Sequence, residues 1–186
     1  MDALIGATAR ILVREGYDKA STNRIAEVAG VSVGSLYQYF PSKEALVAAV
    51  IDRHNEQLMQ IVRGVLAEVA ELPIEAAIRR IVSVAVEAHR VDPKLHRVLT
   101  EQIPRLGKLE NIGAFSRETQ ALFRTLLERH RNELRVTDLE LAAFVCVTSV
   151  EALTHHAVLH RPEFLSKEAA EALIDEATRL VVRYLR

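Results

Sequence analysis

The stretch STNRIAEVAGVSVGSLYQYFPSK, residues 21–43, predicts two short helices joined by a tight turn. Ser21 or Thr22 opens the first helix, because a hydroxyl at that position accepts a hydrogen bond from a free backbone N–H. Gly30 ends this helix, since glycine adopts the left-handed conformation that helix C-termini often need. Pro41 ends the second helix. The two helices and their turn are typical of a helix-turn-helix that reads DNA.

The second of these helices is expected to present a polar surface to solvent. Leu36 and Phe40 are four residues apart and therefore face the core together. The residues that this spacing leaves on the outer face are Val33, Ser35, Tyr37 and Gln38. Small and flat hydrogen-bonding side chains on an exposed helix suit base edges and phosphates. Lys43 stands at the start of the following helix, where a cation and free backbone amides can bind one phosphate together.

Residues 16–46 resemble the helix-turn-helix of the tetracycline-repressor-like (TetR) family. The matching segments are Ser21-Thr22, Ile25-Ala26, Ala29-Gly30-Val31-Ser32, Leu36-Tyr37-Gln38-Tyr39-Phe40 and Lys43-Glu44-Ala45-Leu46. Many residue types have to agree in register for this match, unlike a short motif that recurs by chance. The resemblance implies an all-α homodimer that binds an inverted-repeat operator on double-stranded DNA and responds to a small molecule.

The resemblance also assigns DNA contacts residue by residue. The side chains expected to bind phosphates are Thr22, Tyr37, Tyr39 and Lys43. Those expected to approach base edges are Asn23, Val33, Ser35 and Gln38, and Arg24 suits either role. Through Val50, five basic residues balance five acidic ones, so this region is no basic patch. Specific binding must then rely on a few placed cations, helix N-termini and hydroxyls.

The composition fits a soluble protein that is not exported. Hydrophobic residues make up 49% of the chain, charged residues 26%, and the mean hydropathy is +0.08. We expect no signal peptide and no apolar run long enough to cross a bilayer, and therefore a cytoplasmic protein. Cys146 is the one cysteine, so no internal disulfide can form, and its valine neighbours favour a buried thiol.

Two domains are predicted, a helix-turn-helix domain over residues 1–45 and a helical ligand-binding and dimerisation domain over residues 46–186. A long helix that starts near Lys43 joins them, because apolar residues continue at helical spacing as far as Leu66. Further helices are expected from Ile74 to about His89, and from Asp92-Pro93 to a stop at Pro104. Beyond these we expect a loop or an irregular helix start over 105–113, and a helix that carries Phe115 and Leu127.

The last two helices are expected to form a dimer interface. Thr137 followed by Glu140 is a capping-box pattern that opens a helix apolar nearly all round. Ser166 caps the final helix, whose apolar positions form a broad face. Both helices resemble the dimerisation helices of the family. The alternative is a monomer in which both helices are internal.

The sequence leaves a metal-dependent function open as the alternative to a regulator. Seven histidines are present, and three of them, His155, His156 and His160, lie close together near the end of one helix. Two pairs spaced four residues apart, Glu151 with His155 and His156 with His160, could share a helix face as metal ligands do. The glutamate-between-histidines zinc motif, a glycine-rich phosphate loop and a nucleophile elbow are absent from the sequence. We therefore expect neither an enzyme nor a cofactor.

A ligand-binding cavity is expected among the helices between Leu46 and His160. The candidates are polar or aromatic residues on otherwise apolar helices, namely His89, Gln102, Phe115, Phe123, Cys146, Ser149, Glu151, Leu153 and His155. The simpler reading of each one is core filler or a satisfied buried polar group. These helices carry no cluster of basic residues, so we expect an apolar or amphipathic effector. The resemblance to the TetR family implies a repressor that its effector releases from the operator.

Overall fold

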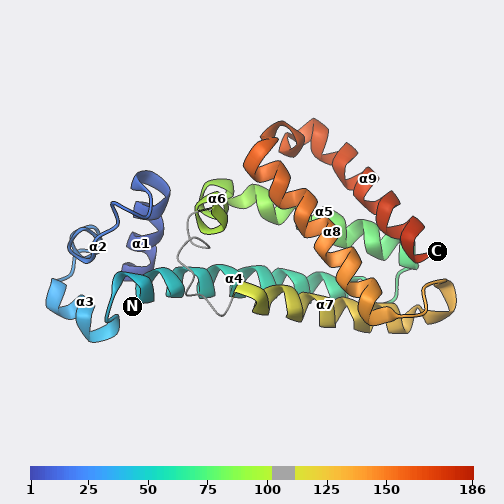
Figure 1. Cartoon of the computed structure of the whole chain (residues 1–186), viewed down its shortest axis with the longest axis horizontal. Coiled ribbons are helices and arrows are strands. Elements are labelled where there is room, and N and C mark those ends of the chain that lie inside the picture. Colours follow the sequence, from blue (N-terminus) through green and yellow to red (C-terminus); the bar gives the residue numbers. More distant parts are fainter. Residues whose placement is uncertain (102–111) are drawn as a thin grey trace. The chain divides into compact units, whose positions relative to one another are not determined.

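The computed structural model describes residues 1–101 and 112–186, and every regular element within these ranges is a helix (Figure 1). The chain forms two compact units. The first comprises Met1–Gln57 with Pro93–Leu109, and the second comprises Leu58–Asp92 with Glu110–Arg186. The prediction of an all-α fold with an N-terminal helix-turn-helix is therefore confirmed.

The first unit contains α1 (Asp2–Glu15), α2 (Thr22–Ala29), α3 (Val33–Tyr39), α6 (Pro93–Glu101) and the N-terminal part of α4 (Lys43–Glu68). One hydrophobic core joins these helices, and its fully buried members include Leu12, Ile25, Leu36 and Leu46. Three short helices alone bury too little apolar surface to be stable. The α4 residues Val47 and Val50 complete this core, as does Val98 of α6.

Local signals set the angle between α2 and α3. The Ser21 hydroxyl accepts a hydrogen bond from the backbone N–H of Arg24, which caps α2. Gly30 has φ 70° and ψ 32°, so α2 ends in the left-handed conformation that only glycine adopts without strain. The Ser32 hydroxyl caps α3 in the same way, by accepting from the N–H of Ser35. These caps fix where α3 starts and therefore which of its side chains face outward.

The second unit contains the remainder of α4, α5 (Ile74–Val91), α7 (Ile112–Arg129), α8 (Leu139–His160), α9 (Lys167–Leu185) and two short 3-10 helices, η2 (Arg131–Glu133) and η3 (Pro162–Leu165). Within this unit α8 packs against α5, α7 and α9, and α9 also packs along α5 (Figure 1). Its core includes Ile78, Phe123, Leu127 and Ile174.

One predicted helix start is wrong. Asp138, not Thr137, is the N-cap of α8, and its carboxylate accepts a hydrogen bond of 2.9 Å from the N–H of Leu141. The guanidinium of Arg131 donates to the backbone carbonyl oxygens of Val136 and Thr137. The carboxylate next to a helix N-terminus also complements the helix dipole, so the cap lies one residue later than the capping-box pattern predicted.

Helix α8 is long and apolar enough, by length and composition alone, to cross a membrane, although no such run was expected from the sequence. The core of a soluble helical bundle passes the same test. Here Ala143, Cys146 and Val147 are buried within the second unit. Packing within this unit accounts for part of the apolar composition of α8, whereas Leu141, Phe144 and Leu153 of the same helix are exposed.

Candidate DNA-binding surface and ligand-binding unit

Helix α3 exposes the side chains that the sequence predicted as DNA contacts. Tyr37 is 52% exposed and Tyr39 is 57% exposed, which is unusual for large aromatic residues. Gln38 between them is also exposed, whereas Val33 and Ser35 are half-buried. Leu36 and Phe40 hold the opposite side of the helix in the core. Such a row of hydrogen-bonding groups on a rigidly packed helix is available to a nucleic acid.

The start of α2 contributes to the same surface. The hydroxyl of Thr22 lies 3.1 Å from the phenolic oxygen of Tyr37, so the two share a hydrogen bond. Asn23 beside it is exposed. The structure thus brings together two residues that the resemblance assigned to phosphate contacts, Thr22 and Tyr37, although they are 15 positions apart.

Lys43 is held in a defined position at the N-terminus of α4. Its Nζ donates a 3.0 Å hydrogen bond to the carbonyl oxygen of Tyr17 and lies 3.8 Å from the centre of that ring. The Tyr17 hydroxyl in turn donates to Glu44 Oε1 at 3.2 Å. The pKa of Tyr17 is raised by burial and then by the Glu44 charge, while backbone hydrogen bonding lowers the pKa of Glu44. An ordered cation at a helix N-terminus is well placed to bind a phosphate.

Arg24 has carboxylate partners that sequence reasoning did not identify. Its guanidinium lies 2.9 Å from Glu27 and 3.4 Å from Glu15, and the side chain is 43% exposed. The hydrogen bond to Glu27 is the main reason why the pKa of Arg24 is raised. The spacing of Arg24 and Glu27 at three residues is a visible signal for that pair. A contact of Arg24 with DNA would have to exchange these partners for a phosphate or a base.

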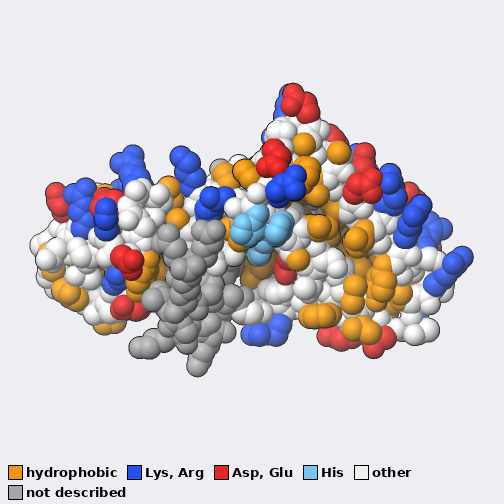
Figure 2. All heavy atoms as spheres, turned by 45° about the horizontal axis from the view of Figure 1, so that its top comes forward, with side chains coloured by type: hydrophobic (Ala, Val, Ile, Leu, Met, Phe, Trp, Pro, Cys, Tyr) orange, Lys and Arg blue, Asp and Glu red, His pale blue; other side chains and the backbone are white. Residues whose placement is uncertain are grey.

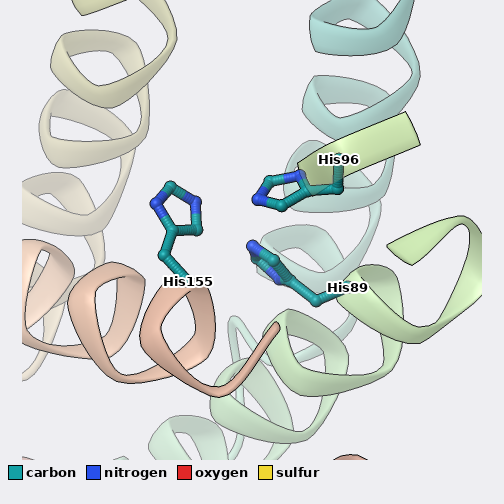
Figure 3. A group of neighbouring side chains, drawn as sticks. All are labelled: His89, His96 and His155. Atoms are coloured by element: carbon teal, nitrogen blue, oxygen red, sulfur yellow. The ribbon is translucent and has the colours of Figure 1, made fainter. Parts of the chain in front are cut away.

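Two of the candidate ligand residues in the second unit, His89 and His155, have their rings in contact in a tilted arrangement. The rings of His89 on α5 and His155 on α8 are 5.1 Å apart at an angle of 57° (Figure 3). His89 Nδ1 lies 2.7 Å from the carbonyl oxygen of Ala85, so the neutral ring donates from Nδ1. Burial lowers the pKa of His89, and burial followed by the His89 charge lowers that of His155 to about 4. Both rings are therefore neutral at neutral pH. Figure 3 also labels His96, which belongs to the first unit.

Glu151 lies one turn before His155 on α8. Its Oε2 accepts a 3.0 Å hydrogen bond from the Ser116 hydroxyl of α7, and that hydroxyl accepts one of 3.1 Å from Gln120. Oε1 is buried and has no hydrogen-bond partner in the described part of the chain. Burial raises the pKa of Glu151, an effect that the Ser116 hydrogen bond partly offsets. Neither Ser116 nor Gln120 was predicted, because Ser116 lies 35 positions from Glu151 and Gln120 is linked to Glu151 only through Ser116.

The other ligand candidates have different environments. Phe123 and Cys146 are buried in the core, and burial raises the pKa of the Cys146 thiol to about 12, so it is an unreactive thiol. Phe115 and Ser149 are half-buried. Gln102, like Pro104 and most of the loop expected over 105–113, lies outside the described residues.

Leu153 lies away from these buried groups, on the outer side of α8. It is 39% exposed and lines a surface groove of about 310 Å³ together with α9 residues, which are Leu173, Glu176, Ala177, Arg179, Leu180 and Arg183. Other large apolar side chains exposed on the same two helices are Leu141, Phe144 and Tyr184. Figure 2 shows hydrophobic side chains gathered over the face that carries α8 and α9. A monomeric protein rarely exposes so many large apolar groups together.

The three histidines proposed as metal ligands, His155, His156 and His160, do not come together at one site. His156 and His160 are exposed and their rings are 4.7 Å apart. His155 instead packs against His89. Two exposed imidazoles at a helix end are fewer ligands than a stable zinc site needs.

Comparison with known proteins gives matches along most of the chain. Residues 4–50 match the model of the tetR family of bacterial regulatory proteins, and residues 73–185 match the tetracyclin repressor-like C-terminal domain. An HTH-type transcriptional regulator of Staphylococcus aureus is 22% identical over 92% of this chain and 89% of its own length. The regulator BetI of Cronobacter sakazakii is 28% identical over 95% of this chain and 87% of its own. The structure of FadR from Bacillus subtilis, in complex with stearoyl-CoA, superimposes with a TM-score of 0.74 at 19% identity, covering 100% of this chain and 99% of that one.

Proposed function

This chain belongs to the TetR family of ligand-responsive, DNA-binding transcriptional regulators, and from that premise we propose that it is a cytoplasmic repressor that a small molecule releases from its operator. The family match favours a regulator over a metal-dependent enzyme or metal sensor. Family members are generally regulators and not enzymes.

DNA binding is supported most directly by the exposed side chains of Tyr37, Gln38 and Tyr39 on α3, a helix that the buried Leu36 anchors in the core. In our proposal Thr22, Tyr37, Tyr39 and Lys43 bind phosphates, and Asn23, Val33, Ser35 and Gln38 approach base edges in the major groove, with Arg24 available to either. The balanced charge around α2 and α3 keeps non-specific affinity low, because counterion release from many cations drives non-specific binding.

A homodimer through α8 and α9 accounts for the exposed apolar side chains on those helices. The groove between them is lined by Leu153, Leu173 and Leu180 together with the charged residues Glu176, Arg179 and Arg183. Protein interfaces combine apolar and charged residues in this way. A dimer presents two recognition helices to the two halves of an inverted-repeat site. It therefore binds this site more tightly than a single protomer would.

The effector is proposed to bind in the second unit, in contact with candidates that include His89, Phe115, Ser149, Glu151 and His155. It is apolar or amphipathic, because burial keeps His89 and His155 neutral and the nearby core of this unit, which includes Phe123, is apolar. Binding then shifts the population toward a state whose recognition helices are spaced wrongly for the operator.

The test of this function is operator release by defined compounds. A bound duplex is first selected from random DNA, and apolar, amphipathic and highly charged compounds are then titrated into the complex. We expect release by apolar or amphipathic compounds and an altered dose response in Ser149→Leu. Release by highly charged metabolites alone, or an unchanged dose response in this variant, would contradict the placement of the effector.

A further inference from the structure

The seam between α7 and α8 changes from polar to apolar along its length. At one end Glu151 meets Ser116, which is linked to Gln120. Phe123 and Leu127 follow at helical spacing on the same face of α7, and both are buried. On α8, Val147 lies one turn before Glu151 and is buried in the same core. The seam therefore has one acidic end and one hydrophobic end.

At the acidic end of the seam, the carboxylate of Glu151 has fewer hydrogen-bond partners than it can accept. A carboxylate can accept several hydrogen bonds, yet within the described residues Glu151 receives one, at Oε2 from Ser116. Its Oε1 is buried without a partner, and no lysine or arginine of the described chain forms an ion pair with it. Burying a polar oxygen without a partner is destabilising, so such a group calls for a ligand or a functional explanation.

The neighbouring histidines do not supply the missing positive charge. The hydrogen bond from His89 Nδ1 to Ala85 leaves the lone pair of a neutral ring on Nε2, which is an acceptor like the carboxylate. His155 packs against His89 and is neutral at pH 7 because it is buried. This part of the second unit is therefore rich in acceptors.

From this arrangement we propose that the effector carries an organic ammonium group that pairs with Glu151 Oε1, while its apolar part lies along the α7–α8 seam toward Phe123. The inference rests on the proposed function and narrows the effector class to cationic amphipathic molecules. An ammonium is favoured over a neutral donor because charge-assisted hydrogen bonds are about twice as strong as neutral ones. It is favoured over a metal ion because Glu151 is in no group of three metal-ligating side chains within 4.8 Å among the described residues.

The test uses a matched set of probes on the full-length protein. 4-Phenylbutylamine, 4-phenylbutan-1-ol and 4-phenylbutanoic acid share an apolar body and differ in charge. Their affinities are measured by calorimetry, and their release of a selected operator duplex by fluorescence anisotropy. Zn²⁺ alone forms a fourth arm. For the wild-type protein we expect the amine to bind about tenfold or more tightly than the alcohol, which is about 1.4 kcal/mol.

Glu151→Gln removes the charge while keeping the shape of the side chain. We expect this variant to lose about tenfold or more in affinity for the amine and to change by less than about twofold for the alcohol. Glu140→Gln is the matched control, because Glu140 is on the same helix and its side chain is 79% exposed. This control should bind all probes as the wild type does. The wild-type comparison of amine with alcohol stands even if Glu151→Gln does not fold.

Several results would overturn the inference. They are equal binding of amine and alcohol, no binding of the amine, an undiminished affinity for the amine in folded Glu151→Gln, or operator release by Zn²⁺ or the carboxylate in place of the amine. Each of these leaves a ligand-released regulator intact. Failure of the proposed function is a different result, namely that no duplex is selected from random DNA.

Discussion

Replacement of Lys43 by alanine is expected to weaken binding to every duplex about equally. The ammonium is held by the Tyr17 carbonyl oxygen at 3.0 Å, which leaves two of its three N–H groups for a phosphate. A phosphate contact carries no sequence information, so specificity should survive the substitution. The free α4 backbone amides remain and bind part of the phosphate charge.

The size of the effect follows from counterion release. Each phosphate contact contributes about 0.9 to the slope of log affinity against log salt, so two half-sites contribute about 1.8. Raising the salt from about 50 to about 200 mM should therefore cost the wild type about tenfold more affinity than Lys43→Ala.

The assay is fluorescence anisotropy with a selected operator and a scrambled duplex across this salt range. Lys43→Met controls for packing, because it keeps the methylenes that lie over the Tyr17 ring 3.8 Å away. Gln38→Ala is the contrasting variant, which should relax specificity at one position by about 1–3 kcal/mol with an unchanged salt slope. If Lys43→Ala and Lys43→Met bind both duplexes with wild-type affinity and slope, the assignment of this surface is wrong.

Three further predictions concern the second unit. Leu180→Glu should split the dimer and reduce DNA binding, because an unpaired charge in a desolvated interface costs several kcal/mol. Leu180 is 49% exposed in the protomer, so the variant should sediment as a folded monomer. A wild-type protein that is monomeric at micromolar concentration would refute the interface. Because burial lowers the pKa of His155 from 6.5 to about 4, the unfolded state binds the proton first, and the free energy of unfolding should fall by up to about 3 kcal/mol as the pH drops from 6.5 to 4. His155→Leu should remove most of this slope in urea titrations, and an unchanged slope would show that the ring is solvated. Phe123→Ala should destabilise the second unit by about 3–5 kcal/mol in chemical denaturation, because the ring is 5% exposed within the core, and a loss below about 1 kcal/mol would contradict that placement.

The helix-turn-helix was predictable because its signals are local. Ser21, Gly30 and Ser32 act through hydrogen bonds and backbone angles within a few residues, and Ser21 and Gly30 bound α2 as expected. The outward face of α3 follows from the inward spacing of Leu36 and Phe40. The start of α8 was misjudged, since Thr137 and Asp138 are both good caps and the pattern alone does not choose between them.

The ligand-binding unit was predicted less completely, because its contacts join residues far apart in the chain. Glu151 was a candidate, but its partner Ser116 lies 35 positions away and no periodicity connects them. Leu153 was a candidate for the effector cavity, yet α8 is exposed at Leu153, where it borders the groove with α9. A helix that is apolar nearly all round does not reveal which side packs in its own chain.

The central claim is that this chain is a dimeric reader of a specific DNA sequence. The most direct measurement is selection of bound duplexes from random DNA by the purified protein, with the stoichiometry of the selected complex measured by sedimentation. We predict enrichment of an inverted repeat with half-sites about one helical turn or slightly more apart, bound by two protomers. Recovery of unenriched sequences, or of a single half-site bound by one protomer, would contradict it.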